Sequence, residues 1–203
     1  GGNILMADIT AMPVQYGIRE VCDLAFYKIA EAGGKGDMVF AIDSAKTSTL
    51  EGASTTVYAQ GGKGNPRLVA WEGEKTLTFT VEDALISKEG LKLLTGSEAT
   101  GEGVIEISAD KFAGYYYVEA KSLARKESNG NDCALDIVFP KVKVQSGFTI
   151  SMAPTGDPST FNYVMDAFPG YVSTEDKTNN HKVLCKMTIG AETTDGNKFT
   201  IGG

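Results

Sequence analysis

The chain contains very little of the chemistry on which most enzyme mechanisms depend. His181 is the only histidine among 203 residues, and it lies in the most polar loop of the chain, beside Asn179 and Asn180. A Ser-His-Asp or Cys-His mechanism needs an oriented and shielded imidazole as its base. A histidine in such a loop is expected to face solvent, so the sequence argues against nucleophilic catalysis and against an enzyme.

Cysteine is also scarce. Cys22, Cys133 and Cys185 are far apart and form no Cys-x-x-Cys pair. The odd number and the wide spacing favour free thiols in a reducing compartment. Three scattered thiols and one histidine do not provide the ligand spacing of a zinc site. We therefore expect no metal and no other cofactor.

Long apolar runs and a surplus of basic residues are absent. No window approaches the roughly 20 apolar residues of a membrane helix, and the N-terminal GGNILM lacks the basic start of a signal peptide. With 26 acidic and 19 basic residues, the net charge is −7. This balance argues against a groove that grips nucleic acid, which needs clustered Lys and Arg. The 42% of hydrophobic residues is enough for the core of one large domain.

A glycine-rich loop is the most conspicuous feature that is present. Residues 61–67 read Gly-Gly-Lys-Gly-Asn-Pro-Arg. A phosphate-binding loop places its lysine before Ser or Thr and opens a helix, whereas Lys63 is followed by Gly64 and Asn65 and then by a strand-like segment. The donors and the helix dipole that hold a phosphate are missing. The loop is therefore predicted to be a turn or an inter-subunit contact.

Most of the chain has the pattern of short strands. Residues 76–82 alternate most clearly, and a turn at 72–75 is predicted to pair them with a strand over 68–71. Residues 19–29 and 38–43 flank a glycine-rich connector and predict a β-hairpin, although 19–29 also fits a helical stripe. Further strands are predicted at 104–108, 115–120, 134–139, 141–144, 148–152, 161–165 and 183–189.

One short helix is predicted over residues 87–96, with Ser87 as N-cap and Gly96 just after its end. Pro140 interrupts a strong strand pattern and predicts a bulge or a sheet edge. Strand-like spacing with a single helix predicts a mainly β fold: one domain over 1–203, an antiparallel β-sandwich or barrel with one flanking short α-helix.

Two segments carry a resemblance to a known family. Residues 57–87, VYAQGGKGNPRLVAWEGEKTLTFTVEDALIS, resemble major tail tube proteins of tailed bacteriophages, which are virion structural proteins. Residues 156–161 and 166–171 are similar to a second segment from the same group. The resemblance implies a sandwich or barrel whose inner sheet joins those of five other copies in a ring. Stacked rings form the tube that conducts DNA during ejection.

The resemblance also implies the partners and the location. Copies of the same chain are the main partner, and the tail sheath, baseplate and tape-measure proteins are further partners. DNA passes through the lumen without specific binding, which an acidic wall favours. The chain is expected in the virion tail after assembly in the host cytoplasm, with no membrane. Contact between subunits is expected from Gly61, Gly62, Lys63, Gly64, Asn65 and Arg67.

Residues 96–135 carry no such resemblance, and a surface insertion is expected there; residues 190–203 are expected to form a C-terminal arm. A capsid decoration or baseplate protein is the alternative interpretation. The geometry of the assembly distinguishes the two, since a tube consists of stacked rings and the alternative is a trimer or an isolated monomer. A carbohydrate-binding module is a third reading. It would present Trp71 and the tyrosines at 115–117 as an exposed platform, but strand alternation sends Tyr116 to the opposite face from its two neighbours.

Overall fold

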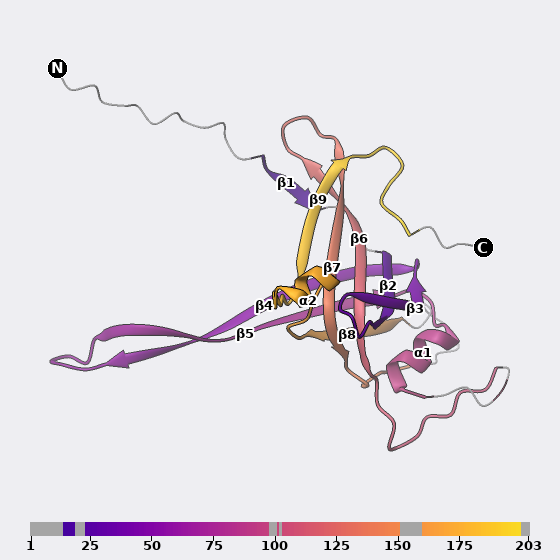
Figure 1. Cartoon of the computed structure of the whole chain (residues 1–203), viewed down its shortest axis with the longest axis horizontal. Coiled ribbons are helices and arrows are strands. Elements are labelled where there is room, and N and C mark those ends of the chain that lie inside the picture. Colours follow the sequence, from indigo (N-terminus) through magenta and orange to yellow (C-terminus); the bar gives the residue numbers. More distant parts are fainter. Residues whose placement is uncertain (1–13, 19–22, 98–100, 102, 151–159, 200–203) are drawn as a thin grey trace.

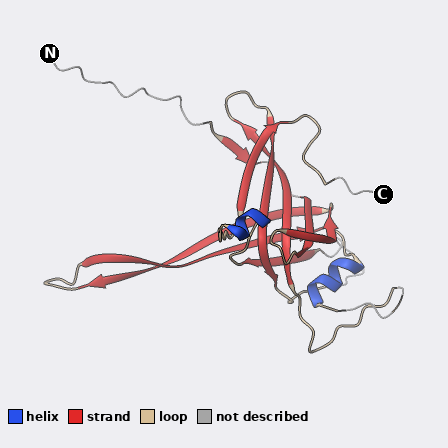
Figure 2. Cartoon of the chain, in the orientation of Figure 1, coloured by secondary structure: helices blue, strands red, loops and turns tan. Residues whose placement is uncertain are grey.

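The computed structural model describes residues 14–18, 23–97, 101, 103–150 and 160–199. Within these ranges the fold is mainly β, as predicted, and its strands form one antiparallel sheet (Figures 1 and 2). The elements are β1 (Tyr16–Ile18), β2 (Asp23–Ile29), β3 (Lys35–Ile42), β4 (Ala45–Gln60), β5 (Arg67–Asp83), α1 (Lys88–Thr95), β6 (Tyr115–Lys126), β7 (Asp132–Val144), β8 (Phe161–Ala167), α2 (Thr174–Thr178) and β9 (Lys186–Glu192). Neither helix in this part of the chain is long and apolar enough to cross a membrane.

The sheet is organised around β6 and β7. Its strand order is β3-β2-β6-β7-β8-β5-β4, and β1 and β9 add to β6 and β7 outside this path. The expectation of a surface insertion at 96–135 needs correction here, because residues 115–126 form β6 and lie in the middle of the sheet. The C-terminal segment 193–199 lies against this sheet, where the Asn197 amide donates to the Ser122 and Leu135 carbonyl oxygens at 3.2 and 3.1 Å.

One face of the sheet carries the core. Alternate residues of β6 and β7 point to this face, and the Phe79 and Phe139 rings stack there with centroids 4.9 Å apart. Burying each such side chain contributes about 1.5–3 kcal/mol. The core brings together β2, β5, β6, β7, β8 and α1 through Leu24, Phe26, Phe79, Val81, Leu93, Leu94, Val118, Ile137, Phe139, Val142, Phe161, Tyr163 and Met165.

Helix α1 begins and ends as predicted. The Ser87 hydroxyl accepts a hydrogen bond from the Gly90 N–H at 3.0 Å, and Gly96 adopts the left-handed conformation with φ of 69°. Both signals are local, which is why the sequence identifies them. Gly96 also lies directly against the backbone of Phe112, so the end of the helix fixes the long loop that follows it.

The predicted strand pair at 68–71 and 76–82 is wrong. These residues form a single strand, β5, and residues 72–75 make no turn. The partner of β5 is β4, which the sequence analysis missed. Residues 45–60 are mostly Ala, Ser, Thr and Gly, and twelve of the sixteen are exposed, so they show no clear alternation of apolar and polar residues.

Other strand predictions had mixed outcomes. The predicted hairpin of 19–29 and 38–43 is confirmed as β2 and β3, although residues 19–22 lie outside the described residues. The predicted strands at 134–139 and 141–144 are one strand, β7, with the expected bulge at Pro140, where the register against β6 shifts between Tyr116 and Val118. Residues 104–108 form no strand, only an isolated bridge from Gly101 to Val104. Residues 148–150 are not a strand, and 151–152 lie outside the described residues.

Candidate assembly surfaces

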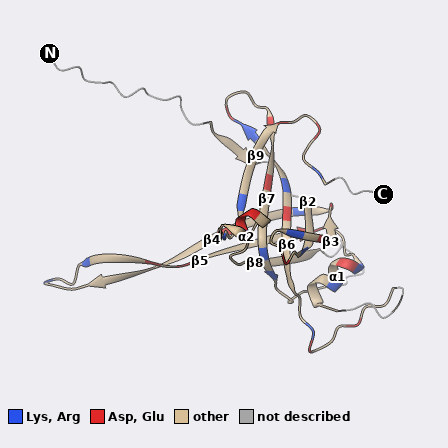
Figure 3. Ribbon diagram, viewed as in Figure 1, with Lys and Arg blue, Asp and Glu red and all other residues tan. Residues whose placement is uncertain are grey.

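The longest feature of the molecule is an exposed β-hairpin, which we call the arm (residues 52–76). It is made by the outer parts of β4 and β5, and Figure 1 shows it extending away from the body. Almost every arm residue is exposed. From the Ser54–Lys75 pair to the loop the arm is about 25 Å long, at roughly 3.4 Å per residue. Its charged residues lie near the tip and near the base, as Figure 3 shows; they are Lys63, Arg67, Glu72, Glu74 and Lys75.

A bulge interrupts the arm near its base. The register of β4 against β5 shifts between Ser54 and Thr56, and the Glu74 N–H donates to the Thr55 hydroxyl at 3.1 Å. A Cβ at Gly73 would lie 3.1 Å from the Thr55 carbonyl oxygen and even closer to its hydroxyl, so this close approach requires glycine. The segment predicted as a turn is thus a bulge, which raises the local twist of a strand pair.

The glycine-rich loop closes the tip of the arm. Gly62 and Gly64 have φ of 82° and 89°, and Asn65 has φ of 50°. The Asn65 N–H donates to the Gly62 carbonyl at 3.1 Å, and no atom lies within 4 Å of a Cβ built on either glycine. The guanidinium carbon of Arg67 lies 4.2 Å from the centroid of the Tyr58 ring. The structure therefore brings the expected contact residues together at an exposed tip, as the turn that the sequence predicts.

The arm also exposes large apolar side chains on both faces. Val57 pairs with Trp71 and Ala59 with Val69 across one face, while Tyr58 belongs to the other. Val57 is 62% and Trp71 56% exposed. An apolar cluster that no other described residue covers marks an interaction surface. Sequence reasoning missed it, although apolar runs flank the glycine loop symmetrically.

An apolar groove lies at the base of the arm. It has a volume of about 520 Å³ and is lined by residues 52–54 of β4, residues 75–77 of β5 and residues 183–185 before β9. Cys185 is partly buried there, and burial raises the pKa of its thiol to about 11. The thiol therefore stays protonated near neutral pH and acts as a small apolar group.

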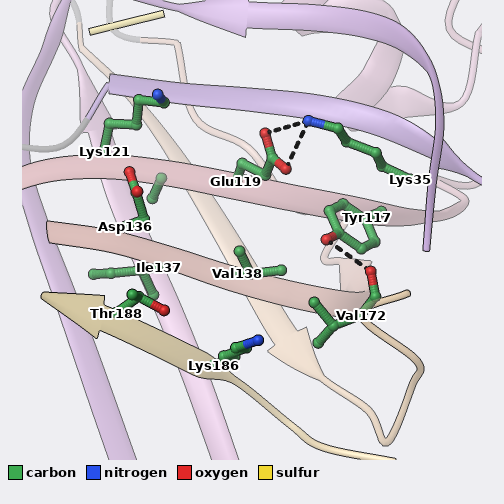
Figure 4. A pocket seen from close by; sticks show the side chains of 11 residues that line it. Lys35, Tyr117, Glu119, Lys121, Asp136, Ile137, Val138, Val172, Lys186 and Thr188 are labelled. Carbon is green, nitrogen blue, oxygen red and sulfur yellow. Dashed lines mark hydrogen bonds and ion pairs between the residues drawn. The ribbon is translucent and has the colours of Figure 1, made fainter. Parts of the chain in front are cut away.

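A second hollow, on the opposite face of the sheet from the core, is charged (Figure 4). Lys35 Nζ lies 3.0 Å from a Glu119 oxygen, and Lys121 stands opposite Asp136 in the β6–β7 register. The Tyr117 hydroxyl donates to the Val172 carbonyl at 3.3 Å, and burial together with the Glu119 charge raises the pKa of Tyr117. The Glu119 carboxylate is thus already paired and the Tyr117 proton is firmly held. This arrangement suits a solvated, ion-paired surface more than acid–base chemistry.

At one end the sheet is only four strands wide, and there it has two free edges. Here it consists of β1, β6, β7 and β9 in that order, because β1 pairs with the end of β6 and β9 with the beginning of β7. In the described part of the chain, no further strand pairs with the outer side of β1 or β9. Such edges present unpaired N–H and C=O groups that can pair with another chain. Ile18 on β1 is 67% exposed and Ile189 on β9 is 43% exposed.

The end of β9 is held by a polar cluster. The Glu192 carboxylate accepts hydrogen bonds from Lys126 at 2.7 Å, Asn129 at 3.1 Å and Asn131 at 2.8 Å. These three residues lie at the turn between β6 and β7, so the cluster fixes the free edge strand to the rest of the sheet.

We expect acid to loosen β9. The hydrogen bonds from Lys126, Asn129 and Asn131 lower the pKa of Glu192 to about 2 from its ordinary 4.5. The ionised carboxylate therefore stabilises the fold fully above pH 4.5, and this contribution is lost as the pH falls towards 2. The effect is small because the group is exposed. Hydrogen exchange of β9 amides between pH 5 and 2.5 should show selective loss of protection, and Glu192→Gln should remove the pH dependence. Equal loss in β6 would contradict this role.

The remaining candidate residues do not form a site. His181 is exposed, as expected. Tyr117 is buried against Tyr27, while Tyr116 packs against Phe26 on the core side, so the tyrosines are split between two faces as predicted and form no platform. Cys133 is a buried free thiol. Among the described residues, no group of three His, Cys, Asp or Glu side chains could hold a metal ion.

Comparison with known protein families gives a match over most of the chain. The model of the YomU/Tube protein family matches residues 16–103 and 97–183. The two ranges together include every described strand except β9, and they include the whole arm. Comparison with curated proteins gives no match.

Proposed function

Because the chain belongs to the YomU/Tube protein family, we propose that this structural, phage tail tube-like protein assembles side by side into hexameric rings. The rings stack into a tube, and the lumen conducts DNA during ejection. The tube is built from copies of the chain in the host cytoplasm and becomes part of the virion tail. Tail sheath, baseplate and tape-measure proteins are its further partners.

The two free sheet edges carry this proposal. β1 and β9 are different strands on opposite sides of the β6–β7 pair, so joining one edge to the other makes a heterologous contact. Contacts of this kind generate rings when the rotation closes. Each copy contributes an even number of antiparallel strands, so β9 of one copy runs antiparallel to β1 of the next. The sheet can then continue around the ring with one hydrogen-bonding pattern and without an exposed edge.

The size and charge of such a ring suit its function. Six copies of a four-stranded segment supply about 24 strands, and barrels of 16–18 strands already leave an aqueous channel. The net charge of −7 favours passage of DNA over its retention. The arm supplies a further contact, with Gly61, Gly62, Lys63, Gly64, Asn65 and Arg67 at its tip against a neighbouring subunit.

Negative-stain electron microscopy across a concentration series tests the proposal directly. Rings or tubes with six-fold symmetry are the expected result. A persistent monomer at high concentration would contradict self-assembly, and a closed trimer would point to a capsid decoration or baseplate protein instead.

A substitution on the β1 edge should separate folding from assembly. Ile18→Lys places a charge on the exposed edge strand, where charges oppose edge-to-edge pairing. We expect an unchanged melting temperature, and ring formation reduced at least tenfold when scored by microscopy and size-exclusion chromatography. Val14→Lys is the matched control, since Val14 is 54% exposed but precedes β1. Normal rings from Ile18→Lys would show that β1 is not the joining edge.

A further inference from the structure

The arm carries an apolar face near its tip and an apolar groove at its base. We propose that the Trp71 face of one copy's arm binds in the groove at the base of the neighbouring copy's arm. The contact would link copies in addition to the pairing of sheet edges, and it rests on the proposed tube function. The occupant is a second copy of this chain, joined through Trp71, Val57 and Val69.

The groove cannot be filled by the arm of its own chain. Trp71 and Leu77 lie six residues apart on β5, which separates them by about 20 Å along an extended strand. Both are held in the same ladder, where Trp71 pairs with Val57 and Leu77 pairs with Gly52. The strands are paired on both sides of the bulge at Gly73 and Glu74, and a strand pair held in this way cannot fold back on itself. Only another molecule can therefore bring the two surfaces together.

The groove offers what a tryptophan side chain requires. Gly52 and Ala53 contribute little bulk to one wall, and Leu77, Leu184 and the Cys185 thiol supply apolar contacts. An indole N–H needs an acceptor when it is buried, and Ser54 lines the groove on the same face of the strand pair as Leu77, so its hydroxyl can accept this hydrogen bond. Lys75 also lines the groove, and an ammonium group attracts the face of an indole ring.

The area of the contact indicates when it forms. Trp71 is 56% exposed, so binding removes only part of the roughly 150–250 Å² that a buried aromatic side chain withdraws from solvent. The two valines add a similar area. The total stays well below the roughly 800 Å² per partner of a standard interface. The contact is therefore too small to hold an isolated dimer. It acts within a ring, where each copy offers one arm and one groove.

Cysteine crosslinking of assembled protein tests the contact. In Trp71→Cys, residue 71 of one copy should lie beside the natural Cys185 of the next, and a short bis-maleimide at pH 8 should join them. We expect a ladder of covalent oligomers on denaturing gels, with at least half of the chains crosslinked. Tyr58→Cys, on the other face of the arm, is the matched control and should give less than a tenth of that yield. Trp71→Cys/Cys185→Ser should give no ladder.

The outcomes separate this inference from the function on which it rests. Rings in the microscope without a crosslinked ladder from Trp71→Cys would overturn the arm-in-groove contact and leave the tube function standing. A wild-type chain that never forms rings would overturn both. If Trp71→Cys itself prevents assembly, Val69→Cys repeats the test from the same face with Trp71 intact, and absence of crosslinking to Cys185 there would also overturn the contact.

Discussion

A chain whose arm is cut back to its base should fold as a stable monomer and no longer form rings. The change replaces residues 55–74 by Asn-Gly, which joins the paired residues Ser54 and Lys75 through the two-residue turn that suits a β-hairpin. The removed residues are almost all exposed, and the core contains none of them. We expect the melting temperature by circular dichroism to stay within a few degrees of wild type, while rings disappear in negative-stain images.

A second variant tests whether assembly depends on the apolar side chains of the arm or only on its length. Val57→Thr/Trp71→Thr keeps the β4–β5 pairing, since threonine is favourable in strands, but removes the largest apolar groups of that face. It should assemble as poorly as the shortened chain. If the shortened chain forms normal rings, the arm has no part in joining subunits, and edge pairing alone must account for assembly.

The largest loss of stability is expected from Gly96→Ala. Gly96 ends α1 with φ of 69°, and a Cβ there would lie 3.0 Å from the Phe112 backbone nitrogen and closer still to its carbonyl group. The left-handed conformation costs a non-glycine residue about 1–2 kcal/mol, and overpacking adds about 1–3 kcal/mol. Urea denaturation should therefore show a free energy of unfolding lower by roughly 2–5 kcal/mol.

Gly130→Ala is a matched control that measures the cost of the left-handed backbone conformation alone. Gly130 has φ of 71°, nearly the same as Gly96, but no atom lies within 4 Å of a Cβ built there. It should lose only the roughly 1–2 kcal/mol of the conformational cost. Equal losses in the two variants would show that Phe112 moves aside freely and that the loop is not fixed by the helix end.

The features that the sequence predicts best are those encoded by neighbouring residues. Ser87 and Gly96 mark α1 through hydrogen bonds and a backbone angle within a few residues of each helix end. Pro140 marks its bulge because it lacks an N–H, wherever its partner strand lies. The hairpin of β2 and β3 is likewise predicted from its short glycine-rich connector.

The features that the sequence does not predict depend on distant partners or on solvent. β4 is stabilised by its ladder with β5, and beyond Leu50 it is exposed on both faces, so burial leaves no pattern in most of its side chains. The Glu72–Lys75 segment has the composition of a turn, but Thr55 across the ladder makes it a bulge. The two free edges follow from which strands pair at β6 and β7, a property of the complete sheet. The loop at 61–67 is evident from its glycines, whereas the arm beneath it is not.

The two free edges of the sheet have a kinetic consequence. Two copies that meet in solution share a single edge-to-edge contact, so they would separate quickly. A copy in a closed ring is held at both edges and by its neighbours' arms, and loses all of these contacts together when it leaves. Rings should therefore appear abruptly above a threshold concentration and after a lag, and the free subunit should stay soluble below that threshold despite its exposed strands.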